Sequence, residues 1–173
     1  MKSLIITVAG MSSRFNKDTK EDVLKCLYYE DTPAYSLLSL QVHKCYDLVD
    51  EIIVVGGYKY EDLEQFIRNE MKDVNSKMKL VYNDHYHDYG SGYSLLKGIE
   101  VVSEKADEII FIEGDLFFDS ESIKKLILSK KDAISINNEP ILSNKAVALY
   151  MDADNYPHYI YDTSHSCLEI HEP

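Results

Sequence analysis

Short runs of consecutive apolar residues alternate with amphipathic segments along most of this chain, and this alternation constrains the fold more than any other feature. Continuous apolar runs of this length are typical of strands that are buried on both faces of a sheet. Strands are therefore expected at residues 3–9, 50–58, 79–83, 107–115 and 132–137. Helices are expected between them at residues 33–47, 60–72 and 121–130, with a further helix that carries Leu95, Leu96, Ile99 and Val102.

The order of these elements predicts the architecture. Parallel strands need crossover connections, and right-handed crossovers place helices on both faces of the sheet. We therefore expect an α/β fold, a three-layer αβα sandwich with a mostly parallel sheet. Two shorter strand-like runs at 145–151 and 158–162 predict a short β extension near the C-terminus. Ligands of such sheets bind beyond the carboxyl ends of the strands, where the loops 9–20, 84–92 and 113–119 are expected to meet.

The residues at the ends and on the apolar faces of the helices refine this prediction. Thr32 is expected to cap the helix at 33–47, and Pro33 suits its first position. Ser120 is expected to cap the helix at 121–130. The apolar face of the first helix is predicted to carry Tyr35, Leu38, Val42 and Cys45, and that of the second Leu63, Phe66, Ile67 and Met71.

Composition excludes several classes of protein. The 173 residues are 45% hydrophobic, which indicates one folded domain over residues 1–173. The formal net charge of -12 argues against binding to nucleic acid. No apolar run approaches the roughly 20 residues that a membrane span needs. The three cysteines form no Cys-x-x-Cys pair, and the first apolar run is too short for an export signal, so a cytoplasmic protein is expected.

The stretch AGMSSRF (9–15) follows the first strand and combines glycine, serines and arginine. Gly10 lets the backbone approach a ligand, Ser12 and Ser13 offer hydroxyl donors, and Arg14 offers a planar fork for phosphate oxygens. Lys17, Lys20 and Lys25 add local positive charge. The stretch is neither a Walker A loop nor a G-x-G-x-x-G motif. It predicts a phosphate-binding loop, with a plain strand-to-loop transition as the alternative.

Two further strand ends carry polar residues. Glu113 and Asp115 flank a glycine at the end of the strand at 107–115. A carboxylate there suits Mg²⁺, although a solvated acidic turn is the alternative. The stretch 82–100 contains Asn83, which could bond a base or a ribose. Its residues 90–92, Gly-Ser-Gly, precede a helix and could present N–H groups to an anion. His85 and His87 lack a partner cluster, and Tyr93 is expected to serve packing.

These three stretches together resemble a known family. AGMSSRF with the later Lys25 resembles the signature loop of nucleotidyltransferases with a GT-A-like, Rossmann-like fold. YND…YGSGYSL (82–95) is similar to a segment of the bacterial choline-phosphate-type cytidylyltransferases, and EGDLFF (113–118) to their metal motif. The likeness covers about residues 3–130.

The resemblance implies a role for each matching residue. The triphosphate would be held by Ala9, Gly10, Met11, Ser12, Ser13 and Arg14. Arg14 and Lys25 would be catalytic, with Lys25 neutralising charge at the reacting phosphate. Asn83, Gly90 and Ser91 would line the base and ribose pocket. Asp115 would hold Mg²⁺ as the cofactor.

The chain also departs from the family pattern. Cys26 stands where the family has a proline after the lysine, and Asn83-Asp84 replaces Asn-Pro. Relatives usually continue further and supply a second metal carboxylate, so the domain is expected to be cut short at its C-terminus. Candidates for that carboxylate are Asp152, Asp154, Asp162 and Glu169.

The predicted activity is transfer of a nucleotidyl group, cytidylyl by preference, from an NTP to a small phosphorylated or phosphonate acceptor, with release of pyrophosphate. CTP is the favoured NTP, and the late strands at 145–162 would suit a homodimer interface. Two alternatives stay open. One is a GT-A-type glycosyltransferase with Mn²⁺ at Asp115, although E-G-D replaces the usual D-x-D. The other is a non-catalytic NTP-binding domain detached from a longer enzyme.

Overall fold

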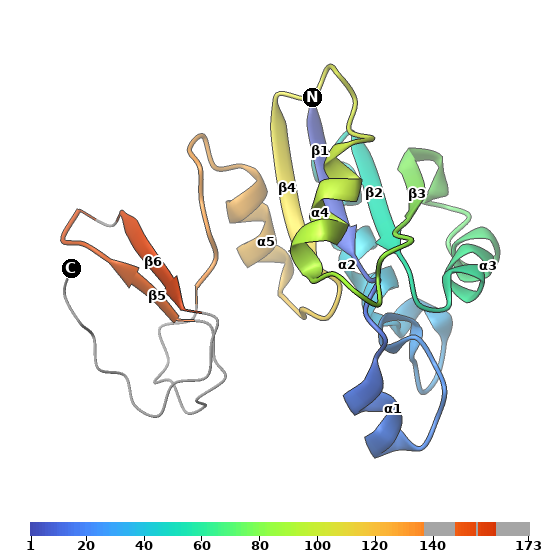
Figure 1. The fold of residues 1–173 in the computed structure, drawn as a ribbon. Coiled ribbons are helices and arrows are strands. Elements are labelled where there is room, and N and C mark those ends of the chain that lie inside the picture. Colours follow the sequence, from blue (N-terminus) through green and yellow to red (C-terminus); the bar gives the residue numbers. More distant parts are fainter. Residues whose placement is uncertain (137–147, 155, 162–173) are drawn as a thin grey trace. The chain divides into compact units, whose positions relative to one another are not determined.

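Four parallel strands form the sheet at the centre of the first part of the chain, in the spatial order β3-β2-β1-β4 (Figure 1). The strands are β1 (Lys2–Thr7), β2 (Glu51–Gly56), β3 (Met78–Tyr82) and β4 (Glu108–Glu113). The computed structural model describes residues 1–136, 148–154 and 156–161, and the chain divides into two compact units, Met1–Ala133 and Ile134–Pro173. β1 pairs in parallel with both β2 and β4, which confirms the predicted parallel sheet.

The α-helices of the first unit follow the strands in the predicted alternation. They are α1 (Ser13–Thr19), α2 (Leu37–Cys45), α3 (Tyr60–Glu70), α4 (Ser91–Ile99) and α5 (Ser120–Ile127). Short 3-10 helices span Lys25–Leu27, Pro33–Tyr35, Tyr46–Leu48 and Asn75–Lys77. None of the helices in the described ranges is long and apolar enough to cross a membrane.

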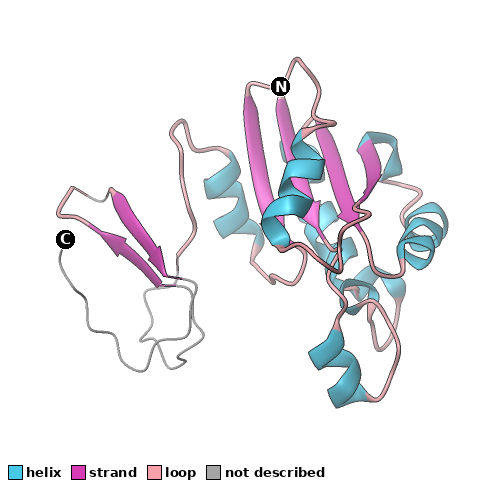
Figure 2. Ribbon diagram, viewed as in Figure 1, coloured by secondary structure: helices cyan, strands magenta, loops and turns pink. Residues whose placement is uncertain are grey.

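Helices cover both faces of the sheet (Figure 2). Helix α4 lies on the face that Ile5 of β1 shares with Ile53 and Val55 of β2, and Leu95 packs there. Helices α2, α3 and α5 lie on the other face, where they pack against Leu4, Ile6 and further residues of β2 and β4. This arrangement confirms the three-layer αβα sandwich.

The central strand β1 explains why the sheet must be covered twice. Leu4, Ile5 and Ile6 are consecutive, so they point to alternating faces, yet none has exposed surface. Truncating one of them to alanine is expected to cost about 2–5 kcal/mol of unfolding free energy. A continuous apolar strand of this kind is stable only between two layers of helices.

The helix predicted at 33–47 is divided in the structure. Pro33–Tyr35 forms a 3-10 turn, and the Thr32 side chain accepts a hydrogen bond from the Ala34 N–H, as expected of a cap. Ser36 then has extended backbone and caps α2 by accepting from the Ser39 N–H. Because the chain turns between them, Tyr35 leaves the apolar face and is 63% exposed, so that part of the prediction is wrong.

The rest of the predicted apolar face of α2 is confirmed, because Leu38, Val42 and Cys45 are all fully buried. Ser120 is the first residue of α5, but the cap is Asp119, whose carboxylate accepts from the N–H groups of Glu121 and Ser122. A carboxylate at this position also suits the positive end of the helix dipole.

Two local predictions differ more strongly from the structure. Helix α1 occupies residues that were expected to form a loop. Residues 132–136 form no strand, so the strand predicted at 132–137 is wrong over its described part, and residue 137 lies outside the described residues.

Helix α4 is confirmed, but Leu96 and Ile99 are 47% and 44% exposed. The helix contacts the sheet through Leu95 and the buried Gly98, and a Cβ on Gly98 would lie 2.6 Å from Ile5 Cγ2. Leu96 and Ile99 lie on the part of the helix surface away from this contact, so the helical spacing of the four apolar residues did not predict their exposure.

The second unit contains an antiparallel pair, β5 (Ala148–Met151) and β6 (Pro157–Tyr161). The carboxylate of Asp152 accepts hydrogen bonds from the N–H groups of Asp154 and Tyr156 in the turn between the strands. The predicted β extension near the C-terminus is therefore confirmed. Asp162, Glu169 and Cys167 lie outside the described residues. The single domain and the homodimer stay predictions.

Candidate active site

Three loops meet at the carboxyl ends of the strands and line a cavity of about 230 Å³. The loop after β1 contributes Ala9, Gly10 and Ser12, the segment before α4 contributes residues 86–91 in part, and the loop after β4 contributes Gly114 and Asp115. The expected meeting of these loops at one edge of the sheet is confirmed. Lys25 also lines the cavity, although it lies on a separate 3-10 turn.

Gly114 allows the loops after β1 and β4 to approach closely. Its N–H donates to the Thr7 carbonyl oxygen over 2.9 Å. A Cβ at this position would lie 2.2 Å from Val8 Cγ1 and 2.7 Å from the Thr7 oxygen, so a side chain would force the loops apart. The glycine between Glu113 and Asp115 is thus a packing requirement of the cavity wall.

Ser12 joins the first loop to the turn that carries Lys25. Its Oγ accepts a hydrogen bond from the Lys25 N–H over 3.0 Å, and its carbonyl oxygen accepts from the Asn16 N–H in α1. Ser12 has a φ of 55°, a left-handed conformation that is uncommon outside glycine. A strained residue at this junction is typical of a site with a fixed ligand geometry.

The predicted catalytic lysine and the predicted metal ligand face each other in the cavity. Lys25 Nζ lies 2.9 Å from Asp115 Oδ2, and the two side chains are 38% and 50% exposed. Glu113, two residues before Asp115, lines the same cavity. Ninety residues separate Lys25 from Asp115 in sequence, so the fold alone creates this pair.

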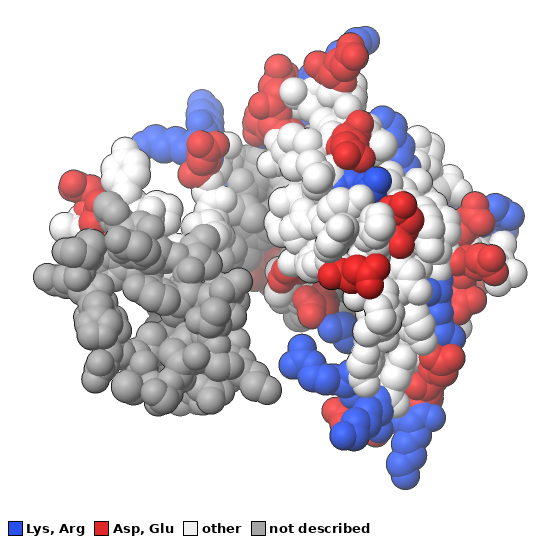
Figure 3. All heavy atoms as spheres, in the orientation of Figure 1, with Lys and Arg blue, Asp and Glu red and all other residues white. Residues whose placement is uncertain are grey.

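Other predicted site residues lie outside the cavity lining. Met11 and Ser13 are exposed, and Arg14 is exposed on α1. Basic side chains gather at the end of the molecule where α1 lies (Figure 3). The assigned roles of these residues stay predictions.

Asn83 is fully buried, and both ends of its amide are occupied. Its Nδ2 donates to Ser94 Oγ over 2.9 Å, and its Oδ1 accepts from the His85 N–H over 2.9 Å. In this structure Asn83 ties the loop after β3 to helix α4. The predicted contact with a base or ribose is not part of this geometry and stays a prediction.

Two tyrosines that the sequence did not single out line the cavity, Tyr86 and Tyr89. The Tyr89 ring lies 4.9 Å from the Tyr93 ring and 5.0 Å from His85. This cluster supports the packing role that was expected of Tyr93. No sequence pattern identifies these two tyrosines as cavity residues, because many other tyrosines occur in this chain. Their position between the third strand and Gly90 is the one feature that could have pointed to them.

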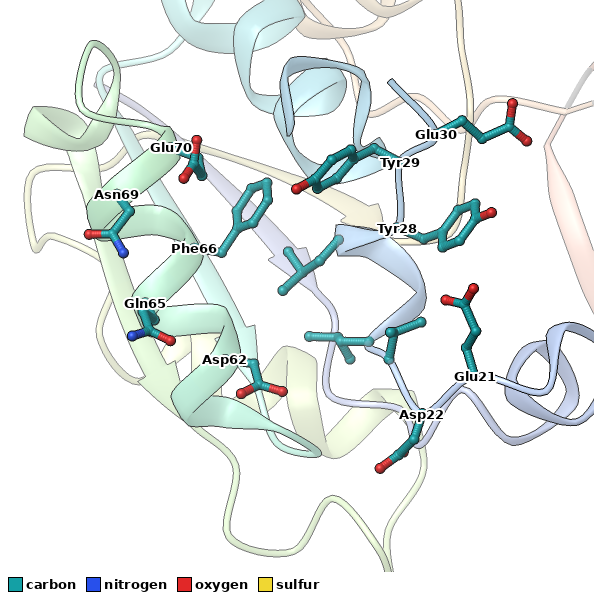
Figure 4. Close-up of a pocket in the computed structure, with 13 residues that line it drawn as sticks. Glu21, Asp22, Tyr28, Tyr29, Glu30, Asp62, Gln65, Phe66, Asn69 and Glu70 are labelled. Carbon is teal, nitrogen blue, oxygen red and sulfur yellow. The ribbon is translucent and has the colours of Figure 1, made fainter. Parts of the chain in front are cut away.

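A second, larger cavity of about 720 Å³ lies between α3 and the segment 21–30 (Figure 4). Its lining contains the carboxylates of Glu21, Asp22, Glu30, Asp62 and Glu70 and no lysine, arginine or histidine. Phe66 and two tyrosines complete part of its wall. A polyphosphate would be repelled there, so the smaller cavity with Lys25 is the better candidate for a nucleotide.

Comparisons with solved structures identify the fold. The inositol-1-phosphate CTP transferase of T. maritima matches with a TM-score of 0.74 and 19% identity over 92% of this chain and 63% of that one. The CTP:phosphocholine cytidylyltransferase of Streptococcus pneumoniae matches with a TM-score of 0.67 and 22% identity over 94% and 65%. A nucleotidyl transferase from Methanothermobacter thermautotroptrophicus matches with a TM-score of 0.59 and 23% identity over 73% and 56%.

These likenesses confirm the predicted resemblance at the level of the fold: the chain has the fold of the nucleotidyltransferases and cytidylyltransferases. It spans about three fifths of the length of these relatives. No curated protein matches the sequence. Residues 21–173 match the model of a family described as a domain of unknown function (DUF6564).

Proposed function

The chain belongs to the family described as a domain of unknown function (DUF6564), and we propose that this member is a nucleotidyltransferase. It would transfer a nucleotidyl group from an NTP to a small phosphorylated or phosphonate acceptor and release pyrophosphate. CTP is the favoured donor, because two of the similar structures are described as CTP-using transferases.

A single observation supports this proposal most strongly. One cavity at the carboxyl end of the sheet joins a glycine-bearing loop, the ammonium of Lys25, the start of α4 at Ser91 and the carboxylate of Asp115. A nucleoside triphosphate needs these features together: close backbone N–H groups, positive charge and an oxygen ligand for a divalent cation. The lining of the acidic cavity between α3 and residues 21–30 contains no lysine, arginine or histidine to bind a triphosphate.

The residues present fit Mg²⁺. Mg²⁺ in such sites is usually bound by one or two carboxylates together with phosphate oxygens and water. Asp115 supplies a half-exposed carboxylate inside the cavity, and Glu113 lies beside it. No group of three or more potential metal ligands occurs among the described residues, so the substrate and water would have to supply the other ligands. We propose that Asp115 would hold the ion, which would offset the charge of the triphosphate.

The reaction needs little covalent work from the protein. An acceptor oxygen forms a new bond to the α-phosphorus, and the bond from that phosphorus to the pyrophosphate oxygen breaks. The acceptor is already an anion at neutral pH, so no general base is required. Lys25 would neutralise charge on the α-phosphate, and Arg14 on α1 would contribute further positive charge. The backbone at Ala9–Ser12 would bind the phosphates, and residues 86–91 would border the nucleoside.

The test is pyrophosphate release. The protein is incubated with each NTP, Mg²⁺ and a panel of phosphorylated and phosphonate acceptors. Acceptor-dependent release with CTP supports the proposal. Binding of CTP without release contradicts catalysis and favours a non-catalytic NTP-binding domain. Release of a nucleoside diphosphate from a sugar nucleotide favours a glycosyltransferase instead.

Substitution of Lys25 refines this test. Lys25→Ala is expected to lower turnover by roughly 100-fold, because it removes a preorganised charge from the reacting phosphate. Lys125→Ala is a matched control, because Lys125 also pairs with a carboxylate, Glu121, over 2.8 Å, but lies on α5 outside the cavity. Equal turnover in the two variants would show that Lys25 is not catalytic.

A further inference from the structure

We infer that Gln41, a residue of α2 outside the cavity, positions Asp115 for metal binding by holding the loop after β4. The inference rests on the proposed function, because it assigns a role to the loop that carries the proposed metal ligand. No feature of the three motif stretches points to Gln41, which is 72 residues from Glu113 in the chain.

Gln41 contacts the loop on both sides of Asp115. Its Nε2 donates to the carbonyl oxygen of Glu113 over 3.2 Å and to that of Leu116 over 2.6 Å. The same two residues close a turn, since the Leu116 N–H donates to the Glu113 oxygen over 3.2 Å. One amide group thus fixes both ends of the turn that contains Gly114 and Asp115.

The burial of Gln41 indicates that its two hydrogen bonds to the loop, and not packing alone, account for a glutamine at this position. The residue is 2% exposed, and among the described residues its Oε1 is buried without a hydrogen-bond partner. An unpaired buried oxygen is unfavourable, so a methionine or leucine would suit the core better if only packing mattered. The two N–H donors are what glutamine adds at this position.

Helix α2 provides a rigid base for this contact. Leu38, Val42 and Cys45 anchor the helix in the core with no exposed surface. One turn after Gln41, Lys44 Nζ donates to the Phe118 carbonyl oxygen over 2.5 Å and lies 4.4 Å from the centre of the Phe117 ring. Side chains of α2 therefore donate hydrogen bonds to three carbonyl oxygens, those of Glu113, Leu116 and Phe118. The Gly114 N–H connects the same loop to β1.

The consequence concerns the direction of the Asp115 carboxylate. It points into the cavity toward Lys25, and its backbone has little freedom while the turn is held at both ends. Mg²⁺ accepts only near-octahedral arrangements, so a small displacement of a carboxylate weakens its binding. Gln41 is a positioning residue in this scheme, and it touches neither substrate nor metal.

The test compares Gln41→Met with the wild-type protein. Methionine keeps the volume and removes both donors, so amide hydrogen exchange at Gly114 and Leu116, followed by NMR, is expected to become at least 10-fold faster. The Mg²⁺ concentration for half-maximal pyrophosphate release is expected to rise about 10-fold, with KM for CTP at saturating Mg²⁺ within 2-fold. Mn²⁺ affinity in the presence of CTP, followed by electron paramagnetic resonance, should fall in parallel.

Ser39→Ala is the control, because Ser39 is an equally buried polar residue of α2 that contacts Ser36 and not the loop. It should leave exchange at Gly114 and the metal dependence unchanged. If Gln41→Met does not fold, Lys44→Met tests the same hold on the loop, with a smaller expected effect.

Unchanged exchange and unchanged metal dependence in a folded Gln41→Met variant would overturn the inference. A wild-type protein without turnover would instead contradict the proposed function. The exchange measurement needs neither nucleotide nor metal, so it still decides in that case whether Gln41 holds the loop.

Discussion

Replacing Asn83 with alanine separates two roles for this residue, anchoring of the loop after β3 and direct contact with a nucleotide. The structure places Asn83 with no exposed surface and with hydrogen bonds to Ser94 Oγ and the His85 N–H, each of 2.9 Å. Each such bond contributes about 1 kcal/mol net, and the partners left unpaired in a buried position add to the loss. Asn83→Ala is therefore expected to lower the free energy of unfolding by about 2–3 kcal/mol.

Ser94→Ala removes only one of the two bonds and is expected to cost about 1 kcal/mol. In the double variant the two losses should not add, because the shared bond is lost once, and a coupling energy of about 1 kcal/mol is expected. Urea unfolding followed by circular dichroism gives these free energies. The anchoring role is refuted if Asn83→Ala leaves the free energy of unfolding within about 0.5 kcal/mol of wild type while CTP affinity falls.

Three further predictions concern buried groups. Burial alone would raise the pKa of Glu51, but the Lys79 ammonium and two other hydrogen-bond donors outweigh it and lower that pKa. The resulting stabilisation is present above the ordinary carboxyl pKa and is lost as pH falls. Glu51→Gln should therefore lower the free energy of unfolding by about 1–3 kcal/mol at pH 7. In urea titrations this difference from wild type should shrink toward about pH 3. Gly98→Ala places a Cβ 2.6 Å from Ile5 Cγ2 and should lower stability by about 1–3 kcal/mol in the same assay. Burial raises the pKa of the Cys26 thiol to about 12, so its alkylation at pH 8, mapped by mass spectrometry, should be roughly 1000-fold slower than in the unfolded chain.

The sheet and its two helical layers could be predicted because the spacing of apolar residues is a local property of the sequence. The run SLIITVA (3–9) overlaps all of β1 except Lys2, and its residues Leu4–Ile6 are fully buried. Helical spacing found Leu38, Val42 and Cys45 on α2. The position of the cavity followed from topology, since parallel strands end at the same edge of a sheet. These predictions required no knowledge of contacts between distant residues.

Helix α1 could not be predicted in this way. None of its residues is buried, so Ser13–Thr19 shows no apolar face. The helix is fixed instead by the left-handed turn at Ser12 and by the contact of that residue with Lys25. Neither the backbone angle of Ser12 nor its contact with Lys25, 13 residues away, produces a periodic pattern of apolar residues that sequence reading could detect. Tyr35 was misplaced for a related reason, because Ser36 competes with Thr32 as the helix cap.

The sequence named residues that line the cavity but not the residues that hold its loops in place. The resemblance to nucleotidyltransferases singled out Lys25 and Asp115, which the structure brings within 2.9 Å, and their roles stay predictions. Gln41 looked like an ordinary polar residue of a helix. Its contacts are with backbone carbonyl oxygens far along the chain, which any residue type can offer, so no sequence pattern marks the partners.

The location of the nucleotide is tested most directly by amide hydrogen exchange with and without CTP and Mg²⁺. The proposed site predicts slower exchange at Ala9, Gly10, Ser12, Gly90 and Ser91, which line the cavity together with Lys25 and Asp115. It predicts no change along residues 62–70 of the acidic cavity. Protection centred on residues 62–70, or no protection at the strand-end loops at saturating CTP, would contradict the proposed site.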